Sequence, residues 1–249
     1  MILPGHRVCR LTVLDFGSFD VGPGKRRIGI PGFLIETDRG ARILVDTGFD
    51  PLYARDPAAA EARDHLSDFG VLIDYSDQNT APGQLARLGL APADITHLVL
   101  SHGHIDHVGA LALFSCPVLL TAAERSTPRP RYWAASQPLA WPDLPYVTIT
   151  AETAFCTGLH LLPTPGHTPG HLSLLVSLGG RHFLLAGDAI NRASEPAEGF
   201  PDAMDPRLAA GSAARLQALQ ARLGAMMIWG HDPSQWQALP KAPQPLAEG

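Results

Sequence analysis

The amino-acid sequence predicts an α/β protein in which two mixed sheets pack face to face and helices cover their outer sides. Short segments rich in β-branched and aromatic residues occur in both halves of the chain, and predicted helices lie between and after them. Gly and Pro make 47 of 249 residues (24 Gly and 23 Pro), which indicates many tight turns. This composition excludes a long helical bundle.

The first half of the chain begins with strands predicted at 8–16, 32–37 and 41–45. Asp38-Arg39-Gly40 supplies the turn of a hairpin between the last two of these. The polar stretch 49–79, interrupted by prolines and rich in alanine, predicts a helix within an inserted loop.

The remaining elements follow the same alternation. Thr80 is a suitable N-cap for a helix that ends before Gly89. A proline-rich connection, 126–145, forms a second inserted loop. The other predicted elements are helices at 81–87, 108–113 and 206–223, the last with a Leu stripe at 208, 216, 219 and 223, and strands at 97–101, 118–121, 160–162, 172–177, 182–186 and 226–229. No linker separates the halves, so we expect residues 1–249 to form a single domain.

Charge and cysteine usage exclude several classes of partner. The net charge of −5 gives no electrostatic footprint for nucleic acid. The 3 cysteines are too few for a disulfide framework and favour a reducing compartment. Neither a signal peptide nor an apolar run of membrane-spanning length is visible, so the sequence predicts a soluble cytoplasmic protein without a membrane partner. A homodimer is left open.

A dense cluster of metal-binding side chains follows the strand predicted at 97–101. Ser101-His102-Gly103-His104-Ile105-Asp106-His107 places four such side chains within six residues. Alternate residues of an extended segment point the same way, so His102 and His104 can bind one ion together, and a turn can direct Asp106 and His107 at a second. Imidazole and carboxylate ligands suit zinc, and they also admit iron, manganese or cobalt.

Further metal-binding side chains follow other predicted strands. His167 lies in the Thr164-Pro165-Gly166-His167-Thr168-Pro169-Gly170-His171 loop after the strand at 160–162. Asp188 follows the strand at 182–186, and His231 follows the strand at 226–229. Each of these residues alone is weak evidence, but together they place every candidate ligand at one edge of the sheets.

These motifs, in this order, resemble the metallo-β-lactamase superfamily, and Val45-Asp46-Thr47-Gly48 matches a further loop of that family. The resemblance covers nearly the whole chain and implies the four-layer αββα sandwich. It also implies that His102, His104 and His167 bind one metal, that Asp106, His107 and His231 bind a second, and that Asp188 bridges them.

Within the superfamily the sequence is most similar to the N-acyl-homoserine lactonase and 4-pyridoxolactonase group. This similarity rests on the segment Leu44-Val-Asp-Thr-Gly-Phe-Asp50 and on the long insertion before His97. One position departs from the group. Its members have a Tyr three residues after the bridging Asp that helps to polarise the lactone carbonyl, whereas this chain has Asn191, which can donate a hydrogen bond but supplies no phenol.

The resemblance implies a dinuclear metal-dependent hydrolase, a lactonase that opens a small lactone ring by attack of a metal-bridging hydroxide, with quorum quenching as its role. Two divalent ions, preferably zinc, would be the cofactors, and a small lactone or other ester the partner. Asp106 is the expected proton acceptor and donor, and Asn191 the expected helper at the carbonyl oxygen. Trp133 and Trp141 are candidate substrate-binding residues, with surface packing as the alternative.

Other functions and roles stay open. A thioesterase of the glyoxalase II type would require a basic patch near the C-terminus, yet Lys241 is the one cation after His231. A phosphodiesterase acting on RNA disagrees with the acidic net charge, and a metal-binding protein without activity is the third alternative. Asp46 is expected to orient a ligand, or else to be a turn residue, and His171 is expected to support the loop rather than bind metal.

Overall fold

The computed structural model of the chain describes residues 2–22, 26–129 and 139–249. Within these ranges thirteen strands form two sheets, of eight and five strands. The first sheet contains β1 (Val8–Val21), β2 (Arg26–Thr37), β3 (Arg42–Val45), β4 (Gly70–Ile73), β5 (His97–Val99), β6 (Val118–Thr121), β7 (Tyr146–Ile149) and β13 (Ala247–Glu248). The second contains β8 (Thr153–Cys156), β9 (Leu159–Pro163), β10 (Leu172–Leu178), β11 (Arg181–Gly187) and β12 (Met226–Trp229).

Each sheet combines antiparallel and parallel pairs. The first runs β13-β1-β2-β3-β5-β6-β7 with β4 beside β1, and its β3, β5, β6 and β7 are parallel. The second runs β12-β11-β10-β9-β8, and β11 pairs with β12 in parallel. Parallel neighbours end at the same edge of a sheet, so the loops after β3 and β5 lie together in the first sheet, and the loops after β11 and β12 lie together in the second.

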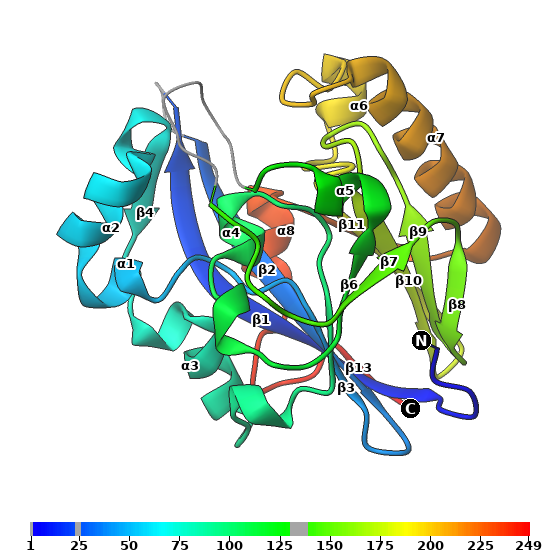
Figure 1. Cartoon of the computed structure of the whole chain (residues 1–249). Helices are drawn as coiled ribbons and strands as arrows, with labels where there is room; N and C mark the ends of the chain where they lie inside the picture. The colour runs from blue at the N-terminus through cyan, green and yellow to red at the C-terminus, as the bar shows by residue number, and fades with distance from the viewer. Residues whose placement is uncertain (1, 23–25, 130–138) are drawn as a thin grey trace.

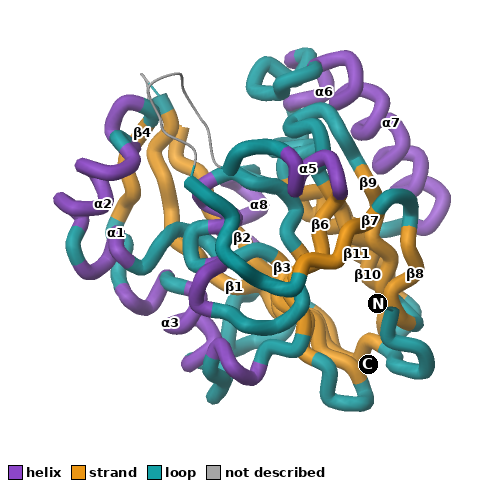
Figure 2. Tube along the Cα trace, viewed as in Figure 1, coloured by secondary structure: helices purple, strands orange, loops and turns teal. Residues whose placement is uncertain are grey.

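The described helices are α1 (Leu52–Arg55), α2 (Pro57–Asp64), α3 (Ala81–Ala86), α4 (Ile105–Val108), α5 (Ala122–Ser126), α6 (Glu195–Glu198), α7 (Pro206–Leu223) and α8 (Pro233–Ala238). Helices cover the outer face of each sheet, whereas Trp236 of α8 packs against the apolar cluster between the sheets. Figure 1 shows α1, α2 and α3 on the left flank, and α6 and α7 on the right flank beside the second sheet. In Figure 2, α1 and α2 on one side and α6 and α7 on the other lie outside the strands.

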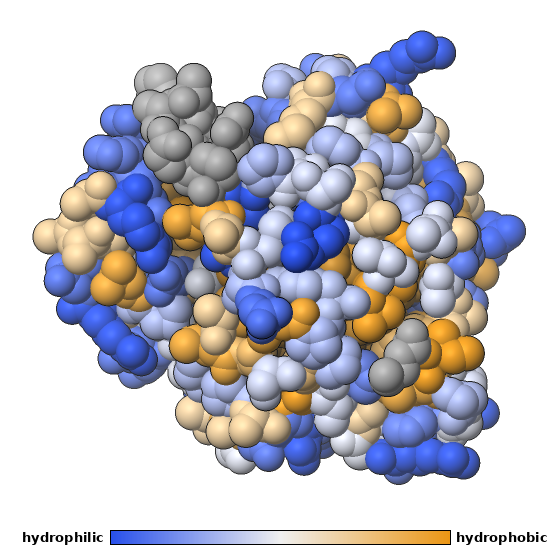
Figure 3. All heavy atoms as spheres, in the orientation of Figure 1, coloured by the Kyte–Doolittle hydropathy of each residue, from blue (hydrophilic) through white to orange (hydrophobic). Residues whose placement is uncertain are grey.

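The apolar core is divided as four layers require. One buried cluster lies between the sheets and includes Leu11 and Ile35 of the first sheet and Leu161 and Val176 of the second. A second cluster joins the opposite face of the first sheet to α1 and α3, and a third joins the second sheet to α7. The predicted αββα sandwich is therefore confirmed. On the face of the molecule that Figure 1 shows, hydrophilic and hydrophobic side chains are mixed over the surface (Figure 3).

The structure matches most predicted elements and differs at a few. The predicted bounds of β6, α7 and β12 agree with the structure, and Thr80 caps α3 by accepting a hydrogen bond from the Gly83 N–H. The Leu stripe of α7 is wrong at Leu208, which is 50% exposed, because Ala209 and Ala213 form the contact with the sheet. Where a helix is predicted at 108–113, the structure has α4, which begins within the His102–His107 motif and ends at Val108, and a separate 3-10 turn at Leu111–Leu113.

The inserted segment 49–79 contributes more than a helix. Besides α1 and α2 it contains β4, which pairs antiparallel with β1 from Ser18↔Ile73 to Val21↔Gly70. This pairing extends the first sheet toward the site. None of the described helices is long and apolar enough to cross a membrane.

Candidate metal centre

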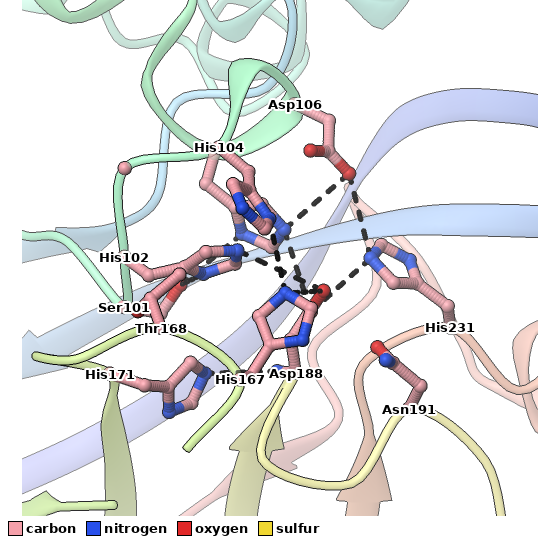
Figure 4. A network of polar contacts seen from close by, with 12 residues as sticks. Ser101, His102, His104, Asp106, His167, Thr168, His171, Asp188, Asn191 and His231 are labelled. Atoms are coloured by element: carbon pink, nitrogen blue, oxygen red, sulfur yellow. Dashed lines mark hydrogen bonds and ion pairs between the residues drawn. The ribbon is translucent and has the colours of Figure 1, made fainter. Parts of the chain in front are cut away.

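All of the predicted metal-binding residues come together in space. His102 follows β5, His104 is the N-cap of α4, His167 lies in the loop after β9, and Asp188 and His231 follow β11 and β12. Their side chains converge on one point between the loops, with Asp106 and His231 on one side and His102 and His104 on another (Figure 4). The first sheet supplies the ligands that follow β5, and the second sheet supplies those that follow β9, β11 and β12, so the two packed sheets together form the site.

The ligand atoms form two groups. Within each group the metal-competent atoms lie within 4.8 Å of one another. The first group is His102, His104, His167 and Asp188, and the second is Asp106, His107 and His231.

Asp188 contacts both groups. Its Oδ2 lies 3.2 Å from His167 Nε2 and 3.8 Å from His102 Nε2. Its Oδ1 lies 3.3 Å from His231 Nε2 and 3.6 Å from His107 Nε2. One carboxylate therefore faces each group with a different oxygen, which is the arrangement needed to bridge two cations.

Hydrogen bonds behind the imidazoles fix which ring nitrogen faces the centre. His231 Nδ1 lies 2.9 Å from the Gly29 carbonyl oxygen, and His107 Nδ1 lies 2.8 Å from Asp46 Oδ2. Both partners only accept, so each Nδ1 carries a proton, and the lone pair of each Nε2 is available to a cation at the centre once that nitrogen is deprotonated. Such partners orient metal ligands and raise their basicity.

Unpaired buried atoms at the centre indicate that the cluster fits metal ions. His102 Nε2, His107 Nε2 and Asp188 Oδ1 are buried and have no hydrogen-bond partner. His104 Nδ1 and His167 Nε2 face each other at 3.0 Å. A buried polar atom without a partner is costly, and divalent cations satisfy such lone pairs.

Burial keeps the first group of imidazoles neutral. It lowers the pKa of His104 to about 4 and the pKa values of His102 and His167 well below the usual range, with neighbouring imidazoles adding to the effect. A metal ligand must be deprotonated, so these three side chains can bind a cation at neutral pH without releasing a proton.

Charge pairing dominates the second group. Burial alone would raise the pKa of Asp106 and of Asp188, but His107 and His231 outweigh it and hold both pKa values below the usual range. Burial opposes the charge on His107, yet Asp106 and Asp46 outweigh it and raise the pKa of that imidazole. The carboxylates are therefore ionised and concentrate negative charge at the centre.

Asp46 supports this centre from behind, as the sequence predicts. It is buried, and its carboxylate accepts hydrogen bonds from the Ser101 N–H, the Ser101 hydroxyl and His107 Nδ1, each at 2.8 Å. The Ser101 oxygen in turn lies 3.0 Å from His102 Nδ1. Asp46 adopts a φ of 60°, a conformation that Asp tolerates better than most residues. One carboxylate thus orients ligands of both groups.

His171 is a supporting residue, again as expected. Its Nδ1 lies 2.9 Å from Thr164 Oγ1, and its Nε2 accepts a hydrogen bond from the Asp188 N–H at 3.0 Å. With both ring nitrogens engaged, His171 holds the backbone that carries Asp188.

Glu124, which is not among the residues predicted from the sequence, joins two ligand loops. This buried carboxylate accepts hydrogen bonds from the Gly103 N–H (2.7 Å), the Thr168 hydroxyl (2.7 Å) and the Gly170 N–H (3.1 Å). Thr121 and Glu124 match the capping-box pattern T-x-x-E, which could have indicated the start of α5. The pattern does not indicate that the Glu124 carboxylate accepts hydrogen bonds from the ligand loops rather than from the start of the helix.

Glu124→Gln is expected to weaken metal binding to the first group by about tenfold and to destabilise the fold by about 1–3 kcal/mol. A glutamine amide offers one acceptor oxygen, so one of the three buried donors loses its partner. Chelator competition and thermal unfolding measure the two effects. The control Glu152→Gln replaces an exposed carboxylate 3.4 Å from Arg215 and should change neither quantity. Wild-type affinity in Glu124→Gln would contradict this role.

A cavity of about 300 Å³ opens beside the metal-binding residues. Its polar lining includes members of both groups together with Asn191, Arg26 and Asp202. Its apolar lining comes from β1, β2 and the inserted segment: Phe19, Val21, Ile28, Phe49, Leu66 and Phe69. The cavity therefore combines a reactive polar end with an apolar wall suited to a hydrocarbon chain.

Of the two candidate substrate-binding tryptophans, the structure describes Trp141. Trp141 lines a neighbouring cavity of about 200 Å³, to which His104 and Met204 of the main cavity also contribute. Its indole N–H donates to the Thr127 carbonyl at 3.0 Å. Trp133 lies outside the described residues.

Comparison with known proteins agrees with this geometry. The family model described as "Metallo-beta-lactamase superfamily" matches residues 30–231. An N-acyl homoserine lactonase from Bacillus thuringiensis is 30% identical over 237 residues, which are 88% of this chain and 89% of that protein. A second, from Bacillus cereus, is 31% identical over 212 residues, 80% of each chain.

Solved structures show the same fold. An N-acyl homoserine lactone hydrolase with the product N-hexanoyl-L-homoserine at its catalytic metal centre superposes with a TM-score of 0.83 at 24% identity, over 96% of this chain and 99% of that one. The chain belongs to the metallo-beta-lactamase superfamily, in the group that includes the N-acyl homoserine lactonases.

Proposed function

We propose that this chain is a dinuclear metal-dependent hydrolase that opens small lactone rings. The observation that carries the proposal is the pair of ligand groups that share Asp188, next to a cavity with an apolar wall. Relatives named N-acyl homoserine lactonases support the substrate class. One structural neighbour is described as a quorum-quenching N-acyl homoserine lactone hydrolase, and quorum quenching is the role that we propose for this chain.

The residues that would hold the metals are the two groups described above. His102, His104 and His167 supply neutral imidazoles to the first ion, and Asp106, His107 and His231 supply ligands to the second, with Asp188 between them. Nitrogen and oxygen ligands favour zinc and also suit iron, manganese or cobalt. When bound, the ions make a hydroxide nucleophile available near pH 7 and stabilise negative charge on the carbonyl oxygen.

Asp106 is the residue best placed to move a proton. Its Oδ2 lies 3.4 Å from His107 Nε2 and 3.5 Å from His231 Nε2, and these imidazoles keep the carboxylate ionised. It can accept the proton of the attacking water and return it to the alkoxide that forms when the ring opens. The leaving alkoxide stays tethered to the acyl group, so the product is a hydroxy acid.

The apolar wall would bind the substituent of the lactone. Phe69→Ala should lower kcat/KM about tenfold for a lactone with a six-carbon acyl chain, through KM, and less than about twofold for an unsubstituted lactone. The Phe69 ring stacks on Phe19 at 5.9 Å and lines the cavity. Val71→Ala, which trims an exposed side chain nearby, is the matched control. Equal losses on both substrates would show that Phe69 acts through the fold instead.

A panel of substrates on metal-loaded protein tests the proposal. The panel should contain an acyl-homoserine lactone, a glutathione thioester and an aryl phosphodiester, each followed directly by product formation. We expect kcat/KM to be highest for the lactone and His104→Ala to abolish the activity. Preference for the thioester or the phosphodiester would overturn the lactonase assignment, and no turnover at all would favour a metal-binding protein without activity.

The single-domain organisation, the cytoplasmic location and a homodimer stay predictions from the sequence.

A further inference from the structure

Asn191 leaves a polar atom without a partner in the wall of the cavity. The residue follows Asp188 in the loop after β11, is 5% exposed and lines the main cavity. Its side-chain oxygen is buried and has no hydrogen-bond partner. Figure 4 shows the Asn191 amide directed toward His231 and Asp188.

Neighbouring groups fix the orientation of this amide. Glu195 accepts a hydrogen bond from the Asn191 backbone N–H and a second from Asn191 Nδ2 at 3.3 Å. The Asn191 carbonyl accepts from the His231 N–H at 2.7 Å, which anchors the backbone. Burial raises the pKa of the Glu195 carboxyl, and the two hydrogen bonds from Asn191 and the Arg192 guanidinium, 4.0 Å away, oppose that rise. An ionised carboxylate only accepts, so the amide nitrogen faces Glu195 and the oxygen faces the cavity.

This orientation favours a different role for Asn191 from the one that the sequence suggests. A residue that polarises a substrate carbonyl must donate, whereas the group without a partner here is an acceptor. A buried acceptor left unpaired is destabilising, and a ligand that brings a donor removes that cost. The neutral amide oxygen suits an uncharged N–H donor.

We propose that Asn191, held by Glu195, is a specificity-determining residue that accepts a hydrogen bond from an N–H group on the substrate. This inference rests on the proposed lactonase function and deepens it. An amide N–H joins the ring of an acylamino lactone to its acyl chain, so the donor lies between the part that reacts and the part that meets the apolar wall. The chain should therefore distinguish acylamino lactones from lactones of the same shape without the N–H.

The test uses two lactones with the same ring and six-carbon acyl chain, one with the amide N–H and one with CH₂ in its place. Wild-type enzyme should show a kcat/KM at least about tenfold higher for the N–H lactone. Asn191→Leu, of similar size but apolar, should bring that ratio near one by losing activity on the N–H lactone alone, and its metal content should stay at the wild-type value. Glu195→Gln should lower the ratio in part, because a glutamine can donate to the Asn191 oxygen and turn the amide.

Other outcomes overturn the inference. If the wild-type enzyme opens the N–H lactone and the CH₂ lactone with similar kcat/KM, the role of Asn191 is contradicted while the lactonase function stands. An equal loss on both lactones in Asn191→Leu would assign Asn191 to the reacting carbonyl or to the fold, and a loss of metal would assign it to the metal centre. If wild-type enzyme opens neither lactone, the proposed function fails and this inference with it.

Discussion

Asp188→Asn is expected to lower kcat/KM for lactone opening by more than about 100-fold. Loss of a residue that only hydrogen-bonds to a metal ligand typically lowers activity about 10–100-fold, and Asp188 is expected to bind the metals itself. The reason is its position: Asp188 contacts imidazoles of both ligand groups through different oxygens, so the change removes a charge that both ions would share. Steady-state kinetics and the metal content of the same sample measure the effect.

The control for this variant makes the same chemical change elsewhere. Asp74 is exposed and has a φ of 49°, a conformation that Asn tolerates, so Asp74→Asn should keep wild-type activity and metal content. If Asp188→Asn retained two ions per chain and full activity, Asp188 would not be the bridging ligand.

Asp46→Ala is expected to combine a loss of stability with a loss of metal affinity. Alanine at a φ of 60° is strained, and the Ser101 N–H loses its buried acceptor. The free energy of unfolding should therefore fall by about 2 kcal/mol or more. Affinity for metal should fall about 10–100-fold, because His107 loses the partner that orients its ring. Chemical denaturation and chelator competition report the two quantities.

Asp46→Asn separates orientation from strain. Asparagine accepts the left-handed backbone and keeps one acceptor oxygen, so stability should fall less than in Asp46→Ala while the metal affinity still drops. Wild-type metal affinity in both variants would show that Asp46 is only a turn residue.

The sequence predicts the ligand set because the candidate ligands lie in the segments that come after strands. The spacing of His102, His104, Asp106 and His107 encodes their proximity locally, and the parallel ends of β11 and β12 bring Asp188 and His231 to the same edge. Apolar patterning likewise predicts nine of the thirteen described strands and α7, since these elements bury one face, whereas it predicts none of β4, β7, β8 and β13.

What the sequence does not reveal depends on contacts between distant loops. Glu124 reaches Gly103 and Gly170 only after the fold has brought three segments together, and its local T-x-x-E pattern indicates a helix start. The orientation of Asn191 depends on Glu195 in the same way. Strand β4 was missed because four residues inside a polar insertion carry little periodic signal until β1 pairs with them.

Titration of metal-free protein with zinc, with lactone opening followed at each addition, tests the central claim most directly. The account predicts no activity in the metal-free protein and a rise in activity that reaches its maximum at two ions per chain. Lactone opening by the metal-free protein, or full activity with a single ion bound, would contradict the proposed dinuclear centre.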